Sequence, residues 1–417
     1  MTSIRFWRHA MRLLLICVAA ALGASPATAG TASVLYSFTG DEDGEYPASE
    51  LVTDAAGSLY GTTVEGGDFN AGTVFQLSRS GDTWTKTVLH HFNGFADGLN
   101  PYGGVAIDAR GNLYGTTTAG GVAGTCAEDG CGVTYKLTNL GGGNWSYGVL
   151  HDFTGGLDGW GPGGQPALDG AGNVYGTTPN GGTHQIGVVY KLHPDGAGGY
   201  DFQVIHHFTG GDDGGTGSLG RLLVDGAGKN IFGIATVGGA HGAGVVYKLR
   251  LMPNGHYKQQ TLYAFQGAPD AGFPYGGLTR DRQGNLYGTT YYDGAHGYGT
   301  VYQLSQSGGV WTERVLHSFE GGADGNNPST NLLFDAAGSL YGTTAEGGAP
   351  GCHCGTIFKL ARDGNGNWNE RIVYRFKGSP DGAYSYYSLI SDGAGGFYGA
   401  TVHGGDDDDG TVYQYTP

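Results

Sequence analysis

One aligned position in a repeated stretch of this 417-residue sequence carries mostly polar residues that could act together on a ligand. The residues at this position are Glu50, Gly104, Gln165, Arg221, Gly277, Asn331 and Ser388. Aromatic residues stand two positions earlier or close by, namely Tyr102, Tyr275, Tyr386 and Trp160. Aromatic rings stack on the C–H faces of sugars, while amide and charged groups bond the hydroxyls. If the stretches converge in space, we therefore predict a carbohydrate site whose ligand-binding residues are Glu50, Tyr102, Trp160, Gln165, Arg221, Tyr275, Asn331 and Tyr386.

Two other interpretations of these residues stay open. The tyrosines could pack between neighbouring repeats while the polar groups meet water. Alternatively, Glu50 could be a general acid or base, and Arg221 a charge-stabilising group, in a hydrolase or lyase for a polysaccharide or lactone, assisted by Ca²⁺. Because the sequence shows no nucleophile–base motif, we favour a recognition or scaffold protein for an extracellular glycan or protein. That interpretation assigns no catalytic residue and requires no cofactor.

Histidines and aspartates in nearby loops are candidate metal ligands. Five consecutive repeats carry one such histidine each: His184, His241, His296, His353 and His403. Neutral imidazole binds metals, but no single loop has the close spacing of a zinc site. The run Asp406–Asp409 could attract Ca²⁺ through its carboxylate oxygens. We interpret this run as solvated charge, with calcium binding as the alternative.

Four cysteines outside the N-terminal segment are expected to pair in an oxidising compartment. The connectivity that we expect joins Cys126 to Cys131 and Cys352 to Cys354, the partners nearest in sequence. A bridge between residues two apart is strained. A free or metal-bound pair at Cys352 and Cys354 therefore stays open as an alternative.

The elements that must position these residues are seven copies of one unit. The segment Leu59–Thr63, which reads LYGTT, recurs in similar form at 113–117, 174–178, 231–235, 286–290, 340–344 and 397–401. Before each copy stands D-x-x-G, as at Asp54–Gly57, which favours a type I turn because the aspartate side chain bonds the backbone two residues on. After each copy come a glycine-rich loop, a strand such as Gly72–Leu77 and, in most repeats, a strand such as Trp311–Phe319.

Four short β-rich runs per unit are typical of a propeller blade, and seven units can close a ring. We predict an all-β protein, with residues 30–417 forming one seven-bladed β-propeller. A copy of the fourth strand opens this region at 33–38, and a copy of the third strand ends it at 410–415. Pairing these two strands would complete the last blade and remove an exposed edge. The long fourth-to-first and second-to-third loops would share one face, where we expect binding.

Residues present in nearly every unit are interpreted as parts of the fold. The histidines of the VLHxF run, such as His151 and His317, are expected on the outer strand as structural or surface residues. The aspartates of the F-x-G-x-x-D loops are expected to cap turns, with a ring of cation ligands as the alternative; they are Asp43, Asp97, Asp158, Asp213, Asp270, Asp324 and Asp381.

Composition narrows the fold and the partners. Glycine accounts for 85 residues, which disfavours helices, whereas 12% of the residues are aromatic, which disfavours disorder. The 37 acidic residues against 21 Lys and Arg give a net charge of −16. Because nucleic-acid binding depends on basic contacts to phosphate, we expect no nucleic acid as a partner. We also expect no membrane span and a monomeric protein.

Residues 1–29 are typical of a secretory signal peptide. Three arginines precede an apolar run at 13–22, and Ala27–Ala29 is an A-x-A cleavage motif. The apolar run is shorter than a membrane-spanning helix requires. We therefore expect the protein to be secreted or periplasmic.

The combination of LYGTT, a GG loop, GTVF or GTVY, W…VLHSF and F-x-G-x-x-D-G resembles the bacterial GloVer tandem-repeat proteins. The resemblance covers essentially residues 31–417. It implies an extracytoplasmic repeat protein, and it supplies no catalytic residues. Proteins of this group carry varied C-terminal anchors, whereas Thr416-Pro417 directly follow the last expected strand here, which leaves surface attachment open.

Overall fold

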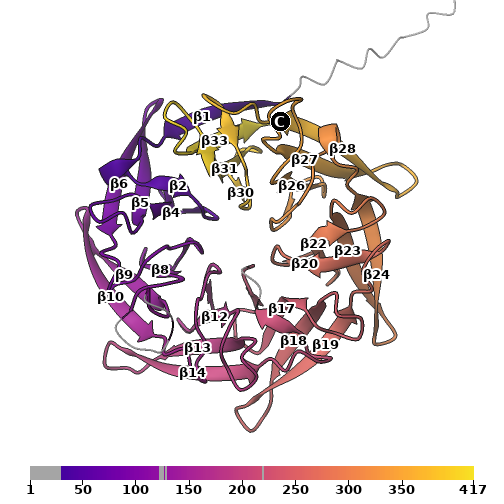
Figure 1. Cartoon of the computed structure of the whole chain (residues 1–417), viewed down its shortest axis with the longest axis horizontal. Helices are drawn as coiled ribbons and strands as arrows, with labels where there is room; N and C mark the ends of the chain where they lie inside the picture. Colours follow the sequence, from indigo (N-terminus) through magenta and orange to yellow (C-terminus); the bar gives the residue numbers. More distant parts are fainter. Residues whose placement is uncertain (1–29, 122–125, 127–128, 218–219) are drawn as a thin grey trace, which may run out of the picture.

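The computed structural model describes residues 30–121, 126, 129–217 and 220–417. The predicted signal peptide lies outside the described residues. In the described part, seven antiparallel sheets of four or five strands surround a central axis (Figure 1), so the prediction of an all-β, seven-bladed propeller is confirmed. The helices there are the short 3-10 turns η1 (Asp41–Asp43) and η2 (Gly322–Asp324), and neither could cross a membrane.

The blades follow one another in chain order. Blade 1 contains β2 (Glu45–Pro47), β3 (Val52–Thr53), β4 (Leu59–Glu65), β5 (Thr73–Ser80) and β6 (Thr83–His91). Blade 2 contains β7 (Val105–Ile107), β8 (Leu113–Thr116), β9 (Val133–Gly141) and β10 (Asn144–Asp152). Blade 3 contains β11 (Ala167–Leu168), β12 (Val174–Thr178), β13 (Val188–Pro194) and β14 (Tyr200–His207). Blade 4 contains β15 (Gly215–Gly217), β16 (Leu223–Val224), β17 (Asn230–Val237), β18 (Val245–Leu251) and β19 (Tyr257–Ala264).

The remaining blades repeat the pattern. Blade 5 contains β20 (Ala271–Pro274), β21 (Thr279–Arg280), β22 (Leu286–Asp293), β23 (Thr300–Ser307) and β24 (Val310–Ser318). Blade 6 contains β25 (Leu333–Phe334), β26 (Leu340–Thr344), β27 (Thr356–Arg362) and β28 (Trp368–Arg375). Blade 7 contains β29 (Gly382–Ala383), β30 (Ile390–Ser391), β31 (Phe397–Thr401), β32 (His403–Gly404), β33 (Thr411–Thr416) and β1 (Thr31–Ser37).

The first and last strands of the described chain close the ring. Strand β1 pairs antiparallel with β33, with Val34 opposite Tyr413 and Ser37 opposite Thr411. The N–H of Phe38 adds a bond to the Gly410 carbonyl at 3.0 Å. The predicted pairing of these segments is therefore confirmed, and Figure 1 shows β1 on the outside of the last blade.

The LYGTT motif forms the second strand of each blade, and its glycine makes room for the third strand. In blade 2, a Cβ on Gly115 would lie 2.2 Å from the Tyr135 hydroxyl oxygen, and Tyr135 is fully buried. The main hydrophobic core lies between adjacent blades, as where Phe92 of blade 1 packs with Val105 and Leu113 of blade 2. Burial of this apolar surface between neighbours holds the ring together.

The repeated aspartates cap turns as expected. In D-x-x-G, the Asp54 side chain accepts hydrogen bonds from the Ala56 and Ser58 N–H groups at 2.9 Å, and Tyr60 of LYGTT donates to it at 2.9 Å. In F-x-G-x-x-D, Asp158 accepts the N–H of Thr154 at 2.9 Å.

The histidines of the outer strands belong to the same structural pattern. His151 lies 3.1 Å from Asp158, and its ring stacks on Phe202 of blade 3 at 3.7 Å between centroids. Burial lowers the pKa of His151, against the effect of Asp158. This histidine therefore joins two blades, as its structural interpretation predicted.

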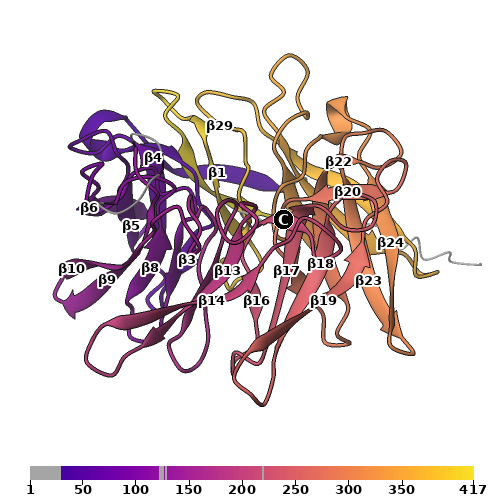
Figure 2. The ribbon, with the colours of Figure 1, turned by 60° about the horizontal axis from the view of Figure 1, so that its bottom comes forward.

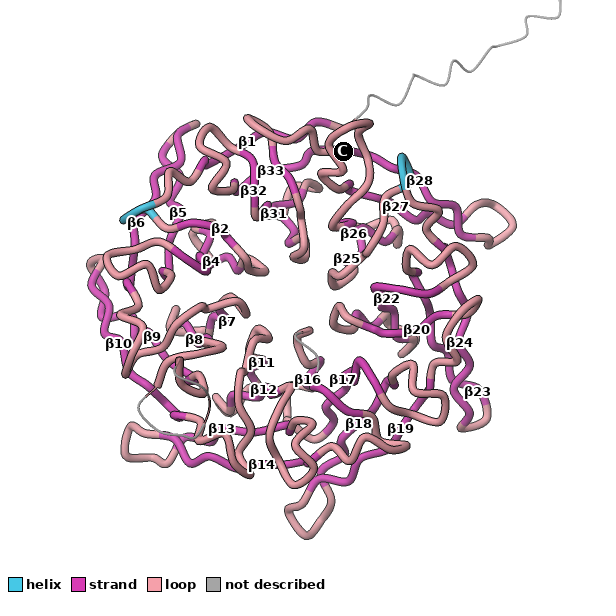
Figure 3. Tube along the Cα trace, viewed as in Figure 1, coloured by secondary structure: helices cyan, strands magenta, loops and turns pink. Residues whose placement is uncertain are grey.

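The two kinds of long loop share one face of the ring, which we call the long-loop face. In each blade the segment that follows the fourth strand pairs with the segment that follows the second strand. The pairing is an isolated bridge in some blades, as between Leu99 and Ala119 or Asn326 and Glu346, and a short strand pair in others, as between β2 and β4. The short hairpins project on the opposite side (Figure 2). Figure 3 shows the loops that approach the axis from every blade.

Candidate ligand-binding pocket at the axial mouth

A pocket of about 370 Å³ occupies the axis. The segments between the fourth strand of one blade and the innermost strand of the next supply Tyr46 (in β2), Tyr102 and Tyr386. Val64, near the end of β4, and Val402, directly after β31, come from the segments that lead into second-to-third loops. Because both loop types belong to the long-loop face, the pocket opens there. Its volume falls in the range of small-molecule sites.

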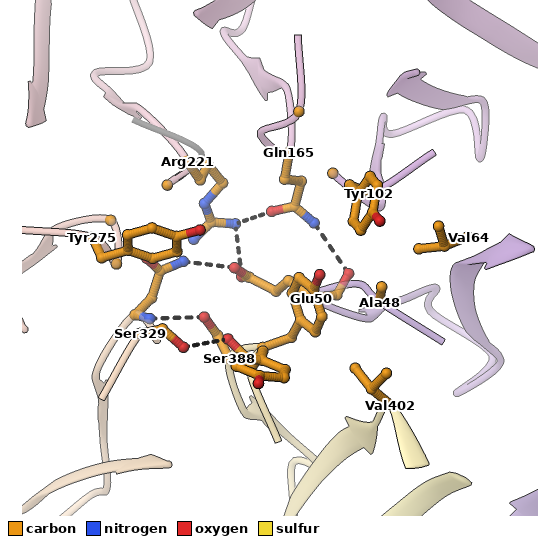
Figure 4. A pocket seen from close by; sticks show the side chains of 18 of the residues that line it. Ala48, Glu50, Val64, Tyr102, Gln165, Arg221, Tyr275, Ser329, Ser388 and Val402 are labelled. Atoms are coloured by element: carbon orange, nitrogen blue, oxygen red, sulfur yellow. Dashed lines mark hydrogen bonds and ion pairs between the residues drawn. The ribbon is translucent and has the colours of Figure 1, made fainter. Parts of the chain in front are cut away.

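The floor of the pocket consists of the residues that precede the innermost strands. Glu50 precedes β3, Gln165 precedes β11, Arg221 precedes β16, and Asn331 and Ser388 precede β25 and β30. Innermost strands of all blades face the axis, so equivalent residues meet there at one height. The predicted convergence of this aligned position is what the structure shows (Figure 4).

Hydrogen bonds join these side chains across the axis. The Asn331 amide donates to Glu50 Oε2 at 2.6 Å, and Arg221 Nη1 lies 3.4 Å from Glu50 Oε1. Arg221 also donates to Gln165 Oε1 at 3.3 Å, and Gln165 Nε2 donates to the Val105 carbonyl at 2.8 Å. The floor is thus a connected polar layer (Figure 4).

Exposure differs strongly within this layer. The Glu50 side chain is 12% exposed and the Arg221 side chain 43% exposed. Arginine carries five N–H donors in a planar fork. The guanidinium is therefore the member of the layer that a ligand reaches most easily, while Glu50 holds it in place.

Two positions of the aligned set are glycines, and their neighbours use the space. A Cβ on Gly277 would lie 2.4 Å from Asn331 Oδ1, and one on Gly104 would lie 2.8 Å from Ser49 Cβ. Side chains at these positions would displace the floor. The glycines therefore shape the floor without contributing a polar group.

Tyrosines form the sides of the pocket. The predicted Tyr102, Tyr275 and Tyr386 all line it, as does Tyr387. Burial, followed by the charges of Tyr275, Tyr102 and Tyr386, raises the pKa of Tyr387. Burial likewise raises the pKa of Tyr275. These phenols keep their protons near neutral pH and can donate to a ligand oxygen.

Trp160 does not belong to the pocket lining. The backbone N–H of Trp160 donates to the Asn180 carbonyl at 3.1 Å, at the position that Leu99 occupies in blade 2. Sequence reasoning missed Tyr46, Tyr387 and Glu65, and it named His403 as a candidate metal ligand only; all four line the pocket. Tyr46 could have been found from its place three residues after Asp43, which the alignment of units makes equivalent to Tyr384.

The candidate metal ligands are dispersed. His403 lines the pocket, whereas His184 contacts Thr183 and His296 lies 4.0 Å from Glu320. Among the described residues, the group close enough to share an ion is His317, Asp324 and Glu370, away from the pocket. The interpretation of Asp406–Asp409 as solvated charge stays a prediction, with calcium binding as its alternative.

Cysteines that are nearest in sequence lie together in the structure. The structure joins Cys126 to Cys131 and Cys352 to Cys354, with Cα atoms 5.2 and 5.1 Å apart. Each bridge lies within a second-to-third loop of the long-loop face. The bridges constrain loops of blades 2 and 6 and do not reach the pocket lining.

Comparison with known proteins identifies the repeat and the fold. The family described as the Gloeobacter/Verrucomicrobia repeat matches residues 24–127, 122–320 and 250–417. No curated protein matches the chain.

Solved structures that are similar in fold include the following two. One is a candidate 6-phosphogluconolactonase from Bacteroides uniformis, with TM-score 0.54 and 17% identity, covering 82% of this chain and 88% of that one. The other is an ancestral GH74 enzyme, with TM-score 0.53 and 12% identity, covering 89% of this chain and 47% of that one. The chain thus spans about half the length of the GH74 enzyme. At these identities the similarity concerns the fold alone.

Proposed function

The chain belongs to the Gloeobacter/Verrucomicrobia repeat family, and we propose that it is a secreted or periplasmic recognition propeller that binds a neutral glycan in the axial pocket. The observation that carries this proposal is the combination of a hydrogen-bonding floor with tyrosine sides. Sugars present hydroxyls at their edges and C–H groups on their faces. A pocket with both kinds of lining matches both kinds of sugar surface.

The charges of the pocket and of the whole chain favour a neutral sugar over an anionic one. Arg221 is paired with Glu50 at 3.4 Å, so these two charges offset each other. Glu65 adds a further carboxylate to the lining, and the whole chain has a net charge of −16. An anionic sugar would meet this negative field. A neutral sugar can accept hydrogen bonds from the guanidinium without that penalty.

The hydrolase or lyase alternative is less well supported by the floor. Glycoside hydrolysis typically needs two carboxyl groups placed on either side of the bond that breaks. Glu50 already has Asn331 at 2.6 Å and Arg221 at 3.4 Å. Proton transfer to or from a substrate would compete with these contacts. The similarity in fold to a candidate lactonase and a GH74 enzyme keeps turnover of a lactone or polysaccharide as a measurable alternative.

A glycan array followed by calorimetry on the retained sugars tests the proposal. We expect retention of neutral glycans, and an affinity at least tenfold lower for Arg221→Met, equivalent to about 1.4 kcal/mol. Arg79→Met is the matched control, because Arg79 lies in the β5–β6 hairpin on the opposite face; its affinity should change less than twofold.

Three results would contradict the proposal. One is the absence of any retained glycan. Another is capture of a glycan-free protein partner by the wild type that Arg221→Met abolishes. The third is turnover of a polysaccharide or lactone, with or without Ca²⁺, that Glu50→Gln removes, since this would establish the enzyme alternative.

A further inference from the structure

A left-handed backbone position recurs in all seven units, three residues after each loop aspartate. The residues there and their φ angles are Tyr46 (56°), Asn100 (57°), Gly161 (71°), Thr216 (53°), Phe273 (56°), Asn327 (58°) and Tyr384 (60°). At each position the N–H donates to the preceding blade, as from Tyr46 to Asp409 and from Phe273 to Ala243. Each blade therefore needs this left-handed backbone position to bond to the blade before it.

Contact between neighbouring blades does not explain which residue stands at this position. Glycine and asparagine tolerate positive φ, whereas a bulky aromatic residue there is an outlier. Units 2, 3 and 6 use asparagine or glycine, but three units use Tyr46, Phe273 and Tyr384. Because an aromatic residue strains the backbone at this position, we expect one where its aromatic side chain has a function.

Two of these rings, Tyr46 and Tyr384, contact residues that line the pocket, whereas Phe273 contacts an exposed tyrosine of blade 5. Tyr46 lines the pocket and lies 5.1 Å from the ring of His403, which also lines it. Tyr384 lies 5.6 Å from His403 and stacks on Tyr386 at 6.2 Å. Phe273 stands edge to face with Tyr292 at 6.3 Å.

The last of these contacts belongs to a row of tyrosines that leaves the pocket over blade 5. Tyr275 lines the pocket and lies 5.3 Å from Tyr291, which lies 4.7 Å from Tyr292. Tyr292 is 54% exposed, and Phe273 supports it from one side. We call Tyr275, Tyr291 and Tyr292 the blade 5 row. Packing between blades does not account for a ring that is more than half exposed.

We infer that the ligand is an oligosaccharide, with one terminal unit in the axial pocket and the following units lying on the blade 5 row. This inference rests on the proposed glycan function and adds the length and direction of the ligand. A monosaccharide would fill the pocket without touching Tyr292. A longer neutral chain gains stacking contacts along a row that is continuous with the pocket.

Calorimetry with β-1,4-linked glucose, mannose and xylose oligomers of one to six units tests the inference. In at least one series, we expect the affinity to rise at least tenfold between the monosaccharide and the tetrasaccharide. Tyr292→Ala should remove most of this rise and leave monosaccharide affinity within twofold. Tyr298→Ala is the matched control, since Tyr298 is an exposed tyrosine outside the row, in the loop that follows β22.

A second variant links the row to the strained position. Phe273→Asn introduces the residue that units 2 and 6 carry there. It should reduce the gain with ligand length, while the melting temperature stays the same or rises because asparagine fits the left-handed backbone.

The results separate the inference from the proposed function. Binding that does not strengthen with length, or an equal loss for monosaccharide and tetrasaccharide in Tyr292→Ala, would overturn the inference and leave the pocket proposal intact. Absence of binding by every member of the three series would overturn both for these sugars, and the array then decides the proposed function on its own.

Discussion

The carboxylate of Glu50 and the guanidinium of Arg221 lie 3.4 Å apart across the propeller axis, although they come from blades 1 and 4. In a seven-membered ring these blades lie nearly opposite each other. Their contact shows that the axis narrows to side-chain width at the floor. The pair therefore closes the pocket at its base and fixes the orientation of its most accessible donor group.

Because the two groups act as one unit, we predict that their substitutions are not additive. Glu50→Gln leaves Arg221 without its counter-charge, and Arg221→Met removes the donor itself. Each should lower glycan affinity at least tenfold, and the double variant should lose little more than the worse single variant. Calorimetry on the four proteins of this cycle measures the coupling. Fully additive losses would show that the groups contact the ligand independently.

Ring closure makes the N-terminal strand essential for stability. Deleting residues 30–37 removes β1 and exposes the edge of β33. We predict a large fall in melting temperature and a tendency to associate through the open edge. A synthetic peptide of residues 30–40, added in excess, should restore part of the lost stability. A truncated protein that melts like the full chain would contradict this account of closure.

The glycine of LYGTT is predicted to be irreplaceable. Gly115→Ala would place a Cβ 2.2 Å from a buried tyrosine oxygen, so the unfolding free energy should fall by about 1–3 kcal/mol. Gly148→Ala is the matched control on β10, because no atom lies within 4 Å of its Cβ and its backbone is not left-handed. Denaturant unfolding compares the two, and equal effects would contradict the steric explanation.

Two outer-rim glutamates predict a loss of stability as pH rises. Burial and then Asp270 raise the pKa of Glu313 from 4.5 to about 8, and burial, together with Asp324, raises that of Glu370 from 4.5 to about 7. A raised folded-state pKa means that the folded form binds protons more tightly. The stabilisation that these two glutamates give the folded protein is therefore complete below pH 4.5 and is lost as the pH rises toward 7 to 8.

The double variant Glu313→Gln with Glu370→Gln should remove this loss. At pH 8 we expect it to be more stable than the wild type by on the order of 1 kcal/mol, after discounting for solvent screening of these partly exposed groups. At pH 4.5 the two proteins should be nearly equal. Glu320→Gln, at an exposed glutamate, serves as the control. If the unfolding free energies of wild type and double variant change with pH in the same way, the prediction is refuted.

The sequence was sufficient to predict the floor because its residues share one position in a repeated unit. Glu50, Gln165 and Arg221 meet since each stands two residues before the start of an innermost strand, and the repeat makes those strands equivalent. The blade order and the closure by β1 follow from the same repetition. The repeat pattern in the sequence was therefore sufficient to predict the features that all seven units share.

The sides of the pocket were harder to predict because they depend on loops that differ between units. Trp160 resembled a pocket residue from its sequence neighbours, but it takes the place of Leu99 and bonds to Asn180 instead. Tyr46 and His403 come from different loops, and their contact depends on how blades 7 and 1 meet. The repeat makes Tyr46 equivalent to Tyr384, but its contact with His403 arises from tertiary packing, which residue spacing does not give.

The most direct test of the central claim is a crystal structure of the protein with a neutral tetrasaccharide that the array retains. We predict density for one sugar unit above the Glu50–Arg221 floor, stacked against Tyr275, with further units over Tyr291 and Tyr292. An empty mouth, with the sugar bound on the hairpin face or the outer rim, would contradict the account.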